Sequence, residues 1–379
     1  MMKILQALFF PPEQPGGVSS MVPYINQKFQ AMGWDMELFS LPKRIRGKGT
    51  EHHEFATFDW TQYSGRPVVD KYMQTLRDYL WFARMRLRNA SYDLIHAHHP
   101  IAALVMRRLF PDTPVLMTVH SSYERELVLN GRIEDQGPEH RFLTSLYREL
   151  EHQTNMIITV SHSFKSYIAQ YVDRPEDIRV IMNGFDPNRF KPVENVNDVP
   201  QIVTLCRLVP AKGLDVLLQA LSIVKKRGHA FVLHLIGDGP IRKELEEMAI
   251  RLGIYDETIF YGYMLHPEEL MPFFDLFVLP SRAEAFGNVF AEAALCRLAL
   301  VGTDVGGIAE QIESGVNGLL VPVDDVHALA DAIEKMLTDG EFRLRMAHAA
   351  YERAKEKSSI ARVIGDLEEV YLSYRASYI

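Results

Sequence analysis

The feature that most constrains the fold is an alternation, repeated in each half of the chain, of short apolar segments and longer amphipathic ones. Runs that are apolar on both faces and separated by helices are typical of a parallel sheet covered on two sides. The first half is therefore predicted to be a doubly wound α/β domain. Its predicted strands are Lys3–Phe9, Met36–Ser40, Leu94–His96, Val115–His120, Met156–Val160 and Val180–Met182, and its predicted helices are Ser19–Met32, Asp70–Asn89, Ile101–Phe110, His140–Asn155 and Ser163–Tyr171.

The same pattern restarts after Pro187–Pro200, a polar stretch that we interpret as a linker. The chain of 379 residues is long enough for two domains. We expect two Rossmann-like domains, residues 1–190 and 191–358, with ligands bound in a cleft at the carboxyl ends of their strands. The predicted strands of the second are Gln201–Cys206, Phe231–Ile236, Thr258–Tyr261, Leu276–Leu279 and Ala299–Gly302, and its predicted helices are Gly213–Arg227, Ile241–Leu252, Pro267–Phe273 and Val289–Cys296.

Charge and cysteine content narrow the class of protein. Residues 1–190 hold 22 Lys and Arg against 21 Asp and Glu, whereas residues 191–379 hold 19 against 28. A net charge of −8 argues against a general nucleic-acid binder, which needs a basic face. The two cysteines, Cys206 and Cys296, favour a reducing compartment. The apolar start is short and interrupted by Gln6, so it predicts a buried strand rather than a signal peptide, and we expect a cytoplasmic protein.

One polar stretch, Lys43–Tyr63, interrupts the alternation and carries interleaved histidines and aromatic residues. A loop of this length is usually functional or mobile. An acceptor-binding loop and a disordered surface excursion are both compatible with the sequence.

Three constellations suggest a phosphate-bearing ligand. Gly16 and Gly17 follow the first strand and precede a helix, where backbone can approach a ligand and N–H groups point outward. The spacing is not that of a dinucleotide fingerprint, which disfavours a nicotinamide enzyme. In the second half, Arg207 and Lys212 follow a strand, and two cations there fit a phosphate, although solvated surface charges are the alternative for either one.

The third constellation is the most specific. Glu284 precedes a predicted helix and Glu292 lies inside it, with the turn Phe286-Gly287-Asn288-Val289 between them. Carboxylates accept hydrogen bonds from sugar hydroxyls, and amides at a helix N-terminus bind phosphates. This order of groups matches a sugar, a diphosphate and a ribose. For a single Glu, a helix-start residue favoured by the dipole is the alternative.

Over nearly its whole length the sequence resembles the GT-B-fold glycosyltransferases of the large retaining family 4. The motifs that carry the resemblance are Gly16-Gly17, Val119-His120, Thr159-Val160-Ser161, Asn183-Gly184-Phe185-Asp186, Arg207…Lys212-Gly213, Gly237-Asp238-Gly239-Pro240, Glu284…Glu292, Gly306-Gly307-Ile308-Ala309-Glu310 and Asn317-Gly318-Leu319-Leu320.

The resemblance implies a role for each site residue. Arg207 and Lys212 would bind the diphosphate, and Gly17 would complete that site from the other domain. Glu284 would bind the donor sugar, and Glu292 the ribose. The amides of Gly287, Asn288 and Val289 would contact the sugar and phosphates, Gly262-Tyr263-Met264 would lie against the base, and His120 would lie near the reacting carbon. Residues 359–379 would form a helix that packs back on the first domain.

The resemblance also implies transfer of a hexose or N-acetylhexosamine with retention, by front-face attack and without a metal cofactor. Cys206, Ala285, Arg297 and Ala309 stand where the family often has Gly or Pro, and Ser121 where Asp is frequent. A metal site at His96, His98 and His99 is disfavoured, because no cysteine or spaced carboxylate set completes it.

The sequence says less about the donor and the acceptor. A UDP-sugar is the favoured donor, and the acceptor is a lipid-linked sugar, a cell-surface glycan or a cyclitol. Alternatives are a nucleotide-sugar epimerase, a phosphorylase or a non-catalytic sensor. The oligomeric state is not indicated. Basic clusters at 43–48, 84–88 and 107–108 fit either peripheral contact with an anionic membrane at the inner face of the cell or, as we prefer, solvated helix faces.

Overall fold

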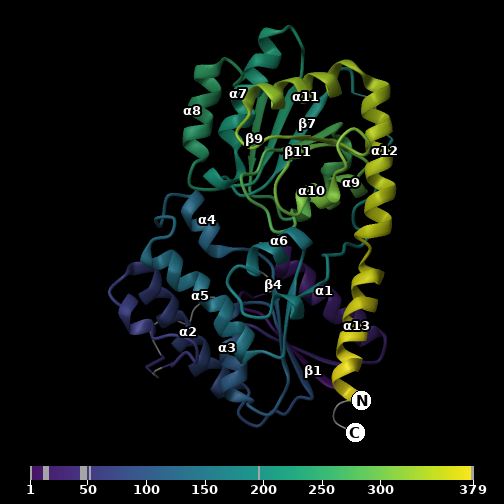
Figure 1. The fold of residues 1–379 in the computed structure, drawn as a ribbon. Helices are drawn as coiled ribbons and strands as arrows, with labels where there is room; N and C mark the ends of the chain where they lie inside the picture. The colour runs from purple at the N-terminus through teal and green to yellow at the C-terminus, as the bar shows by residue number, and fades with distance from the viewer. Residues whose placement is uncertain (1, 12–16, 43–48, 51–52, 195–196, 377–379) are drawn as a thin grey trace. The chain divides into compact units, whose positions relative to one another are not determined.

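The computed structural model describes residues 2–11, 17–42, 49–50, 53–194 and 197–376, and the chain forms two compact units (Figure 1). One unit is Met1–Met182 with Ala361–Ile379, and the other is Asn183–Ile360. Arg189, which precedes the expected boundary at residue 190, pairs with Glu268 of the second unit at 3.0 Å between Nε and Oε1. Residues 183–190 therefore belong to the second unit.

The first unit is built on a parallel sheet with the order β2-β1-β3-β4-β5-β6 in the described chain. The central strands β3 and β4 are buried at every position, which explains their continuous apolar sequence. The predicted strands are confirmed, most of them ending one or two residues earlier than expected. The strands are β1 (Lys3–Ala7), β2 (Asp35–Phe39), β3 (Leu94–Ala97), β4 (Val115–Val119), β5 (Met156–Thr159) and β6 (Arg179–Val180).

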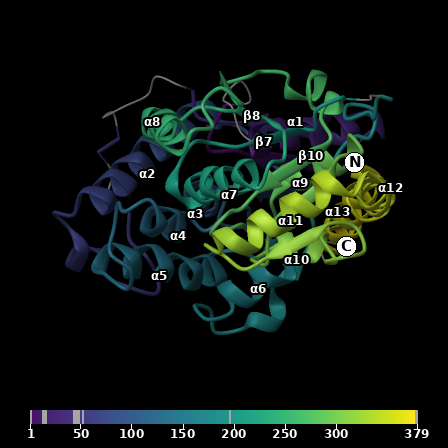
Figure 2. The same ribbon diagram turned by 90° about the horizontal axis from the view of Figure 1, so that it is seen from above.

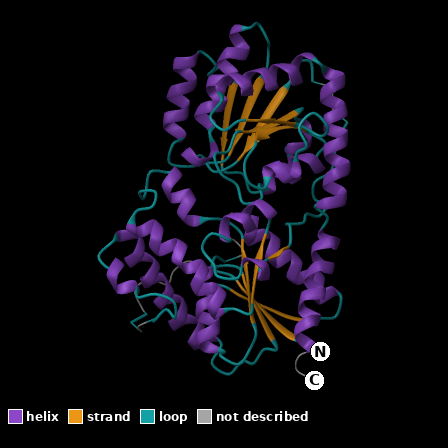
Figure 3. Ribbon diagram, in the orientation of Figure 1, coloured by secondary structure: helices purple, strands orange, loops and turns teal. Residues whose placement is uncertain are grey.

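Helices cover the first sheet, as Figure 3 shows. Several of them begin with proline. An N–H in the first turn of a helix has no partner within the helix, so its absence in proline costs nothing there. The α-helices of this unit are α1 (Gly17–Ala31), α2 (Pro67–Arg86), α3 (Pro100–Leu109), α4 (Tyr123–Leu129), α5 (Pro138–Gln153), α6 (His162–Ile168) and α13 (Ile360–Ala376). The last of them places Tyr371 against Gln6 of β1, with 3.0 Å between the amide nitrogen and the phenol oxygen.

The second unit has a parallel sheet with the order β12-β11-β10-β7-β8-β9 among the residues that the structure describes. From β7 the chain proceeds through β8 to β9 on one side, and from β10 through β11 to β12 on the other. The strands are β7 (Gln201–Leu205), β8 (Val232–Ile236), β9 (Thr258–Gly262), β10 (Leu276–Leu279), β11 (Ala299–Thr303) and β12 (Leu319–Val321). The two sheets confirm the predicted α/β class.

The helices of the second unit lie on both faces of its sheet, and α7 and α11 run side by side over one face (Figure 2). Burial of Leu217, Leu221 and Ile333 between these helices and the sheet fixes that layer. The helices are α7 (Leu214–Lys226), α8 (Arg242–Leu252), α9 (Asn288–Leu295), α10 (Ile308–Gln311), α11 (Val326–Thr338) and α12 (Gly340–Lys357).

One predicted helix is wrong. Pro267–Phe273 forms two short 3₁₀ turns, Pro267–Glu269 and Met271–Phe273, in place of an α-helix. Pro272 has no N–H to donate and its ring crowds the preceding turn, which disfavours an α-helix in so short a segment.

The described part of the Lys43–Tyr63 stretch is packed against α5. The buried Glu149 carboxylate accepts hydrogen bonds from the N–H groups of Ala56 and Thr57, each at 2.8 Å, and from the Thr57 hydroxyl. The Phe58 ring lies 5.9 Å from that of Phe142. Residues 53–63 are thus held against α5 by hydrogen bonds and ring contacts, and their role in acceptor binding stays a prediction. Residues 43–48 and 51–52 lie outside the described chain.

Arg107, from one of the predicted basic clusters, has a structural role. The Arg107 guanidinium donates to the Gln153 carbonyl at 2.6 Å and to the Asn155 side chain at 2.5 Å, which joins the end of α3 to the end of α5. Among the described helices, none combines the length and the apolar character needed to cross a bilayer.

Candidate functional site

The loops after β7 and β10 meet at the centre of the second sheet. These strands are neighbours, with Leu276 paired to Ile202, and the chain leaves them in opposite directions. In open α/β sheets such a switch point leaves a crevice at the carboxyl ends of the strands, and ligands bind there. The loops are anchored to each other, because the Arg282 N–H donates to the Ala211 carbonyl at 2.8 Å.

Lys212 and Glu284 are paired across this point. Lys212 ends a 3₁₀ turn, Pro210–Lys212, and its Nζ lies 2.5 Å from Oε1 of Glu284. The Ser281 hydroxyl donates to the same oxygen at 2.9 Å. The two side chains are only 19% and 13% exposed. Burial opposes the charged ammonium, but the attraction of Glu284 outweighs it and raises the pKa of Lys212. Two predicted site residues are thus brought together as opposite charges.

Glycines allow the backbone to pass behind this pair. Gly306 has φ +54°, and a Cβ there would lie 1.9 Å from the Glu284 carbonyl oxygen. The N–H of Gly307 donates to that carbonyl at 3.2 Å. On the other loop, a Cβ on Gly213 would lie 2.1 Å from the Pro280 carbonyl oxygen. The position of Glu284 therefore depends on the absence of side chains at 213 and 306.

Helix α9 begins directly after the Glu284 loop. Gly287 has φ +83° at its N-cap, a left-handed conformation that glycine adopts without strain. The Gln311 amide donates to the Phe286 carbonyl at 2.5 Å, and the Asn183 amide to the Asn288 side chain at 2.8 Å. These bonds fix the turn Phe286–Val289. The first N–H groups of the helix that follows have no partner within the helix. The turn can thus offer amides to an anion.

Glu292 lies within α9, as expected, and is half-buried. Desolvation by burial raises the pKa of Glu292 to about 7, with Arg189 opposing and Glu268 adding to the shift. A carboxyl that titrates near neutral pH is typical of functional sites.

The remaining predicted donor residues lie at the same end of the sheet. Arg207 follows β7 and is exposed. Gly262 ends β9, has φ +76° and accepts a hydrogen bond from the Gly237 N–H at 2.9 Å. The next residue, Tyr263, is 54% exposed, and Met264 is half-buried.

In the first unit, His120 lines a cavity of about 160 Å³ at the carboxyl ends of β1, β3 and β4. The sheet order reverses between β1 and β3, so this cavity also lies at a switch point. The residues that line it are mostly apolar and aromatic, and those described include no Lys or Arg. Of the predicted glycines, Gly17 begins α1, and Gly16 lies outside the described residues.

The histidines after β3 are joined to His120 by hydrogen bonds. His98 Nδ1 lies 3.0 Å from His120 Nε2, and His98 Nε2 lies 2.6 Å from Gln6 Oε1. His96 contacts the Tyr371 hydroxyl and Thr118 Oγ1, each at 2.7 Å. Burial lowers the pKa of His120 to about 4 and that of His96 to about 3. These rings are consequently neutral at physiological pH, and each has a protein partner on at least one ring nitrogen.

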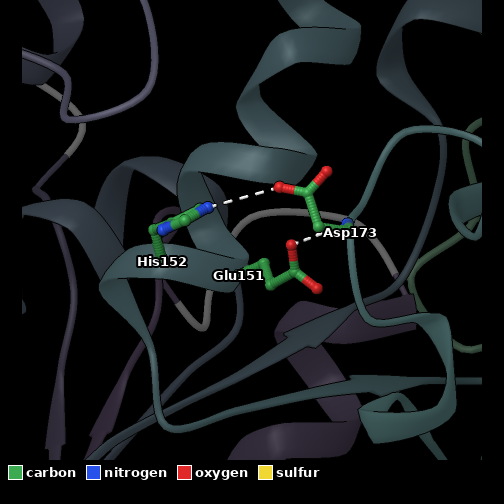
Figure 4. A group of neighbouring side chains, drawn as sticks. All are labelled: Glu151, His152 and Asp173. Carbon is green, nitrogen blue, oxygen red and sulfur yellow. Dashed lines mark hydrogen bonds and ion pairs between the residues drawn. The ribbon is translucent and has the colours of Figure 1, made fainter.

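A separate group of potential metal ligands, Glu151, His152 and Asp173, is drawn in Figure 4. Glu151 accepts hydrogen bonds from the N–H groups of Asp173, at 2.8 Å, and Arg174, at 2.6 Å. Asp173 pairs with Arg148 at 3.1 Å. The carboxylates thus hold the turn after α6, and we assign this group a structural role.

Sequence reasoning missed Ser281, Gln6 and Tyr371. Gln6 had a usable signal, because it is a polar residue inside a strand that is otherwise buried and apolar. Nothing in the spacing of the C-terminal helix singles out Tyr371.

Two family models match the chain, one described as Glycosyltransferase Family 4 over residues 15–189 and one described as Glycosyl transferases group 1 over residues 186–353. An α-D-kanosaminyltransferase of Streptomyces kanamyceticus is 33% identical over 178 residues, which are 46% of each chain. An N-acetyl-α-D-glucosaminyl L-malate synthase of Bacillus anthracis is 26% identical over 74% of each chain.

Solved structures share the fold. Sucrose-phosphate synthase from Thermosynechococcus elongatus superposes with a TM-score of 0.82 at 21% identity, covering 99% of this chain and 100% of the other. The Anabaena protein HepE, solved with UDP-glucose, gives a TM-score of 0.71 at 22% identity, covering 98% and 100%.

Proposed function

Because the chain belongs to the glycosyltransferases of family 4 and has their GT-B fold, we propose that it transfers a hexose or N-acetylhexosamine from a UDP-sugar to a hydroxyl group, with retention of configuration. The observation that carries this proposal is the Lys212–Glu284 pair at the switch point of the second sheet, beside the start of α9. It puts a cation for phosphate and a carboxylate for sugar hydroxyls in contact.

The donor is proposed to lie along the carboxyl ends of β7, β9 and β10. Arg207 and Lys212 bind its diphosphate together with the amides of the turn at Gly287. Glu284 binds the sugar, Glu292 the ribose hydroxyls, and Gly262–Met264 the base. UDP is favoured because HepE is solved with UDP and with UDP-glucose. The predicted contacts of His120 and Gly17 with the donor stay predictions.

The chemistry requires stabilisation of the departing diphosphate. Cleavage of the anomeric C–O bond leaves its electron pair on the β-phosphate oxygen, and positive charge develops at the anomeric carbon. A guanidinium, an ammonium and helix amides can stabilise that anion electrostatically, so we propose that no metal cofactor is needed. The leaving phosphate takes the proton of the acceptor hydroxyl as that oxygen bonds to the same face of the sugar.

The cavity in the first unit is proposed as the acceptor site. At about 160 Å³ it is smaller than pockets for drug-sized ligands and has room for a single small ring. Because no Lys or Arg is among the described lining residues, an uncharged polyol or sugar fits better than a phosphorylated one. This favours a cyclitol or the terminal ring of a glycan.

Thermal-shift measurements with UDP, GDP, ADP and their sugar conjugates test the donor. UDP compounds should raise the melting temperature progressively with concentration, and Lys212→Ala should weaken that shift. A shift with GDP or ADP compounds but none with UDP contradicts the choice of base. For the chemistry, NMR of the product should show the anomeric configuration of the donor, and EDTA should leave turnover unchanged.

A further inference from the structure

A continuous chain of hydrogen bonds joins the C-terminal helix to the cavity of the first unit. It runs from Tyr371 on α13 through Gln6 of β1 and His98 to His120. A branch leads from the Tyr371 hydroxyl through His96 to Thr118. Tyr371 is fully buried, and so are Gln6 and, within a few per cent, His96.

The chemistry of the members sets the direction of each bond. The Gln6 amide nitrogen donates to the Tyr371 oxygen, so Gln6 Oε1 is the atom that faces His98 Nε2. An amide oxygen only accepts, and His98 Nε2 must therefore carry a proton. Burial holds the pKa of His98 well below its usual value, so His98 is neutral and its Nδ1 has a lone pair.

The same reasoning continues to His120. Since His98 Nδ1 accepts, the hydrogen of this bond belongs to His120 Nε2. His120 is also neutral, which leaves its Nδ1 without a proton. That nitrogen is buried and has no hydrogen-bond partner within the described part of the chain. His120 lines the cavity, and a ligand bound there reaches Nδ1 by displacing the atoms that cover it. A buried acceptor without a donor is costly in a folded protein unless something else supplies the hydrogen.

We propose that Tyr371 is a positioning residue: acting through Gln6 and His98, it holds His120 in the Nε2–H tautomer, so that Nδ1 accepts a hydrogen bond from a hydroxyl of a sugar or polyol in the cavity. Phosphate and carboxylate oxygens cannot supply that hydrogen, so this position selects hydroxyl donors over anions. The identity of the hydroxyl ligand rests on the proposed function, whereas the tautomer of His120 does not.

The first test is a proton–nitrogen correlation spectrum of the full-length ¹⁵N-labelled protein without ligand, with His120→Asn used to assign the His120 signals. We expect His120 protonated at Nε2 and unprotonated at Nδ1. If Nδ1 carries the proton, the Gln6 amide has the opposite orientation and the proposal is wrong. This measurement needs no variant of the relay and no substrate.

The second test removes one hydroxyl from α13. Tyr371→Phe keeps the ring in the core but deprives Gln6 of its acceptor, so the Gln6 amide can turn and the His120 signals should show a mixture of tautomers. Tyr374→Phe is the matched control, because that hydroxyl bonds to the Asn155 carbonyl and lies outside the relay. Unchanged His120 signals in a folded Tyr371→Phe variant, or equal changes in both variants, overturn the positioning role.

Kinetics test the ligand. Tyr371→Phe should raise the KM for the acceptor or lower kcat by about three- to tenfold. A rise in the KM for the nucleotide sugar alone places the hydroxyl contact of His120 on the donor and refutes its contact with the acceptor. If the tautomer changes and both acceptor parameters do not, the hydroxyl contact is refuted. If no sugar nucleotide is turned over at all, the proposed function has failed, and the spectra still decide the relay.

Discussion

Lys212 and Glu284, which are 72 positions apart in sequence, form a direct ion pair between the loops that follow β7 and β10. The pair places opposite charges at the switch point between β7 and β10, from which the chain continues in opposite directions across the second sheet. Each proposed ligand contact of this unit lies along the same edge.

Removing the ammonium should abolish most of the activity. Lys212→Ala takes away a cation that is proposed to stabilise the departing diphosphate, and the loss of one such stabiliser costs roughly 10²- to 10³-fold in kcat. Initial rates with a saturating donor measure it. Lys243→Ala on α8, a largely exposed lysine, is the control and should behave as the unchanged protein does. Wild-type rates from Lys212→Ala contradict the assignment.

The pair should also be coupled energetically. Lys212→Met leaves the poorly exposed Glu284 carboxylate with the Ser281 hydroxyl as its remaining described partner, and Glu284→Gln leaves an uncompensated ammonium. In a double-mutant cycle by urea denaturation, the double variant should be more stable than the sum of single effects implies, by about 1–3 kcal/mol. Additive effects indicate that the two charges do not interact in solution.

Glu292 should make stability depend on pH. Its pKa is about 7 in the folded chain because burial disfavours the charged form, and it returns to its usual lower value on unfolding. The folded state therefore binds more protons than the unfolded state between those two values. The free energy of unfolding should consequently fall as pH rises from 5 to 8, by about 1–3 kcal/mol from this group.

Denaturation curves at the two pH values, compared with those of Glu292→Gln, isolate this contribution. The amide does not titrate, so its variant should lose the corresponding part of the pH dependence. A pH dependence identical in both proteins means that Glu292 is ionised throughout the range.

A methyl group behind the Glu284 loop should displace it. Gly306→Ala would put a Cβ 1.9 Å from the Glu284 carbonyl oxygen in addition to the strain of a positive φ. Gly315→Ala has the same kind of strain, with φ +82°, but no atom within 4 Å of the added Cβ. We expect Gly315→Ala to cost about 1 kcal/mol and Gly306→Ala clearly more, with loss of transfer activity in the latter alone. Melting temperatures and transfer rates of the two variants measure these effects. Equal losses of stability and activity in both variants rule out the close contact.

Arg297 offers a test of backbone strain. It has φ +61° just after the C-cap of α9. Its guanidinium lies 5.1 Å from the centre of the Tyr351 ring. Arg297→Gly and Arg297→Ala both remove this contact, so their difference reports the backbone alone. The glycine variant should be more stable by about 1 kcal/mol in urea denaturation, and an alanine variant of equal stability contradicts the left-handed conformation.

The sequence predicts the layers of this protein better than its polar interior. Apolar runs such as Val115–Val119 identify strands because burial on both faces leaves little choice of residue. The loops that carry Lys212 and Glu284 are predictable because each follows such a strand. The pattern of Pro267–Phe273 suits a helix, but Pro272 disfavours one in so short a segment, and the prediction of a helix is wrong there. The Gln6–Tyr371 contact spans 365 positions, and no local pattern encodes a partner at that separation.

The position of Tyr371 makes the first unit depend on a helix that is synthesised late. Its ring packs 5.3 Å from Phe29 and 6.1 Å from Trp34, so a helix from the tail of the chain fills the interior of the unit that is made first. When residues 1–182 have left the ribosome, the core of this unit still lacks the side chains of α13. That unit stays unfinished while the entire second unit is translated, and an amino-terminal fragment expressed alone would expose apolar surface and aggregate.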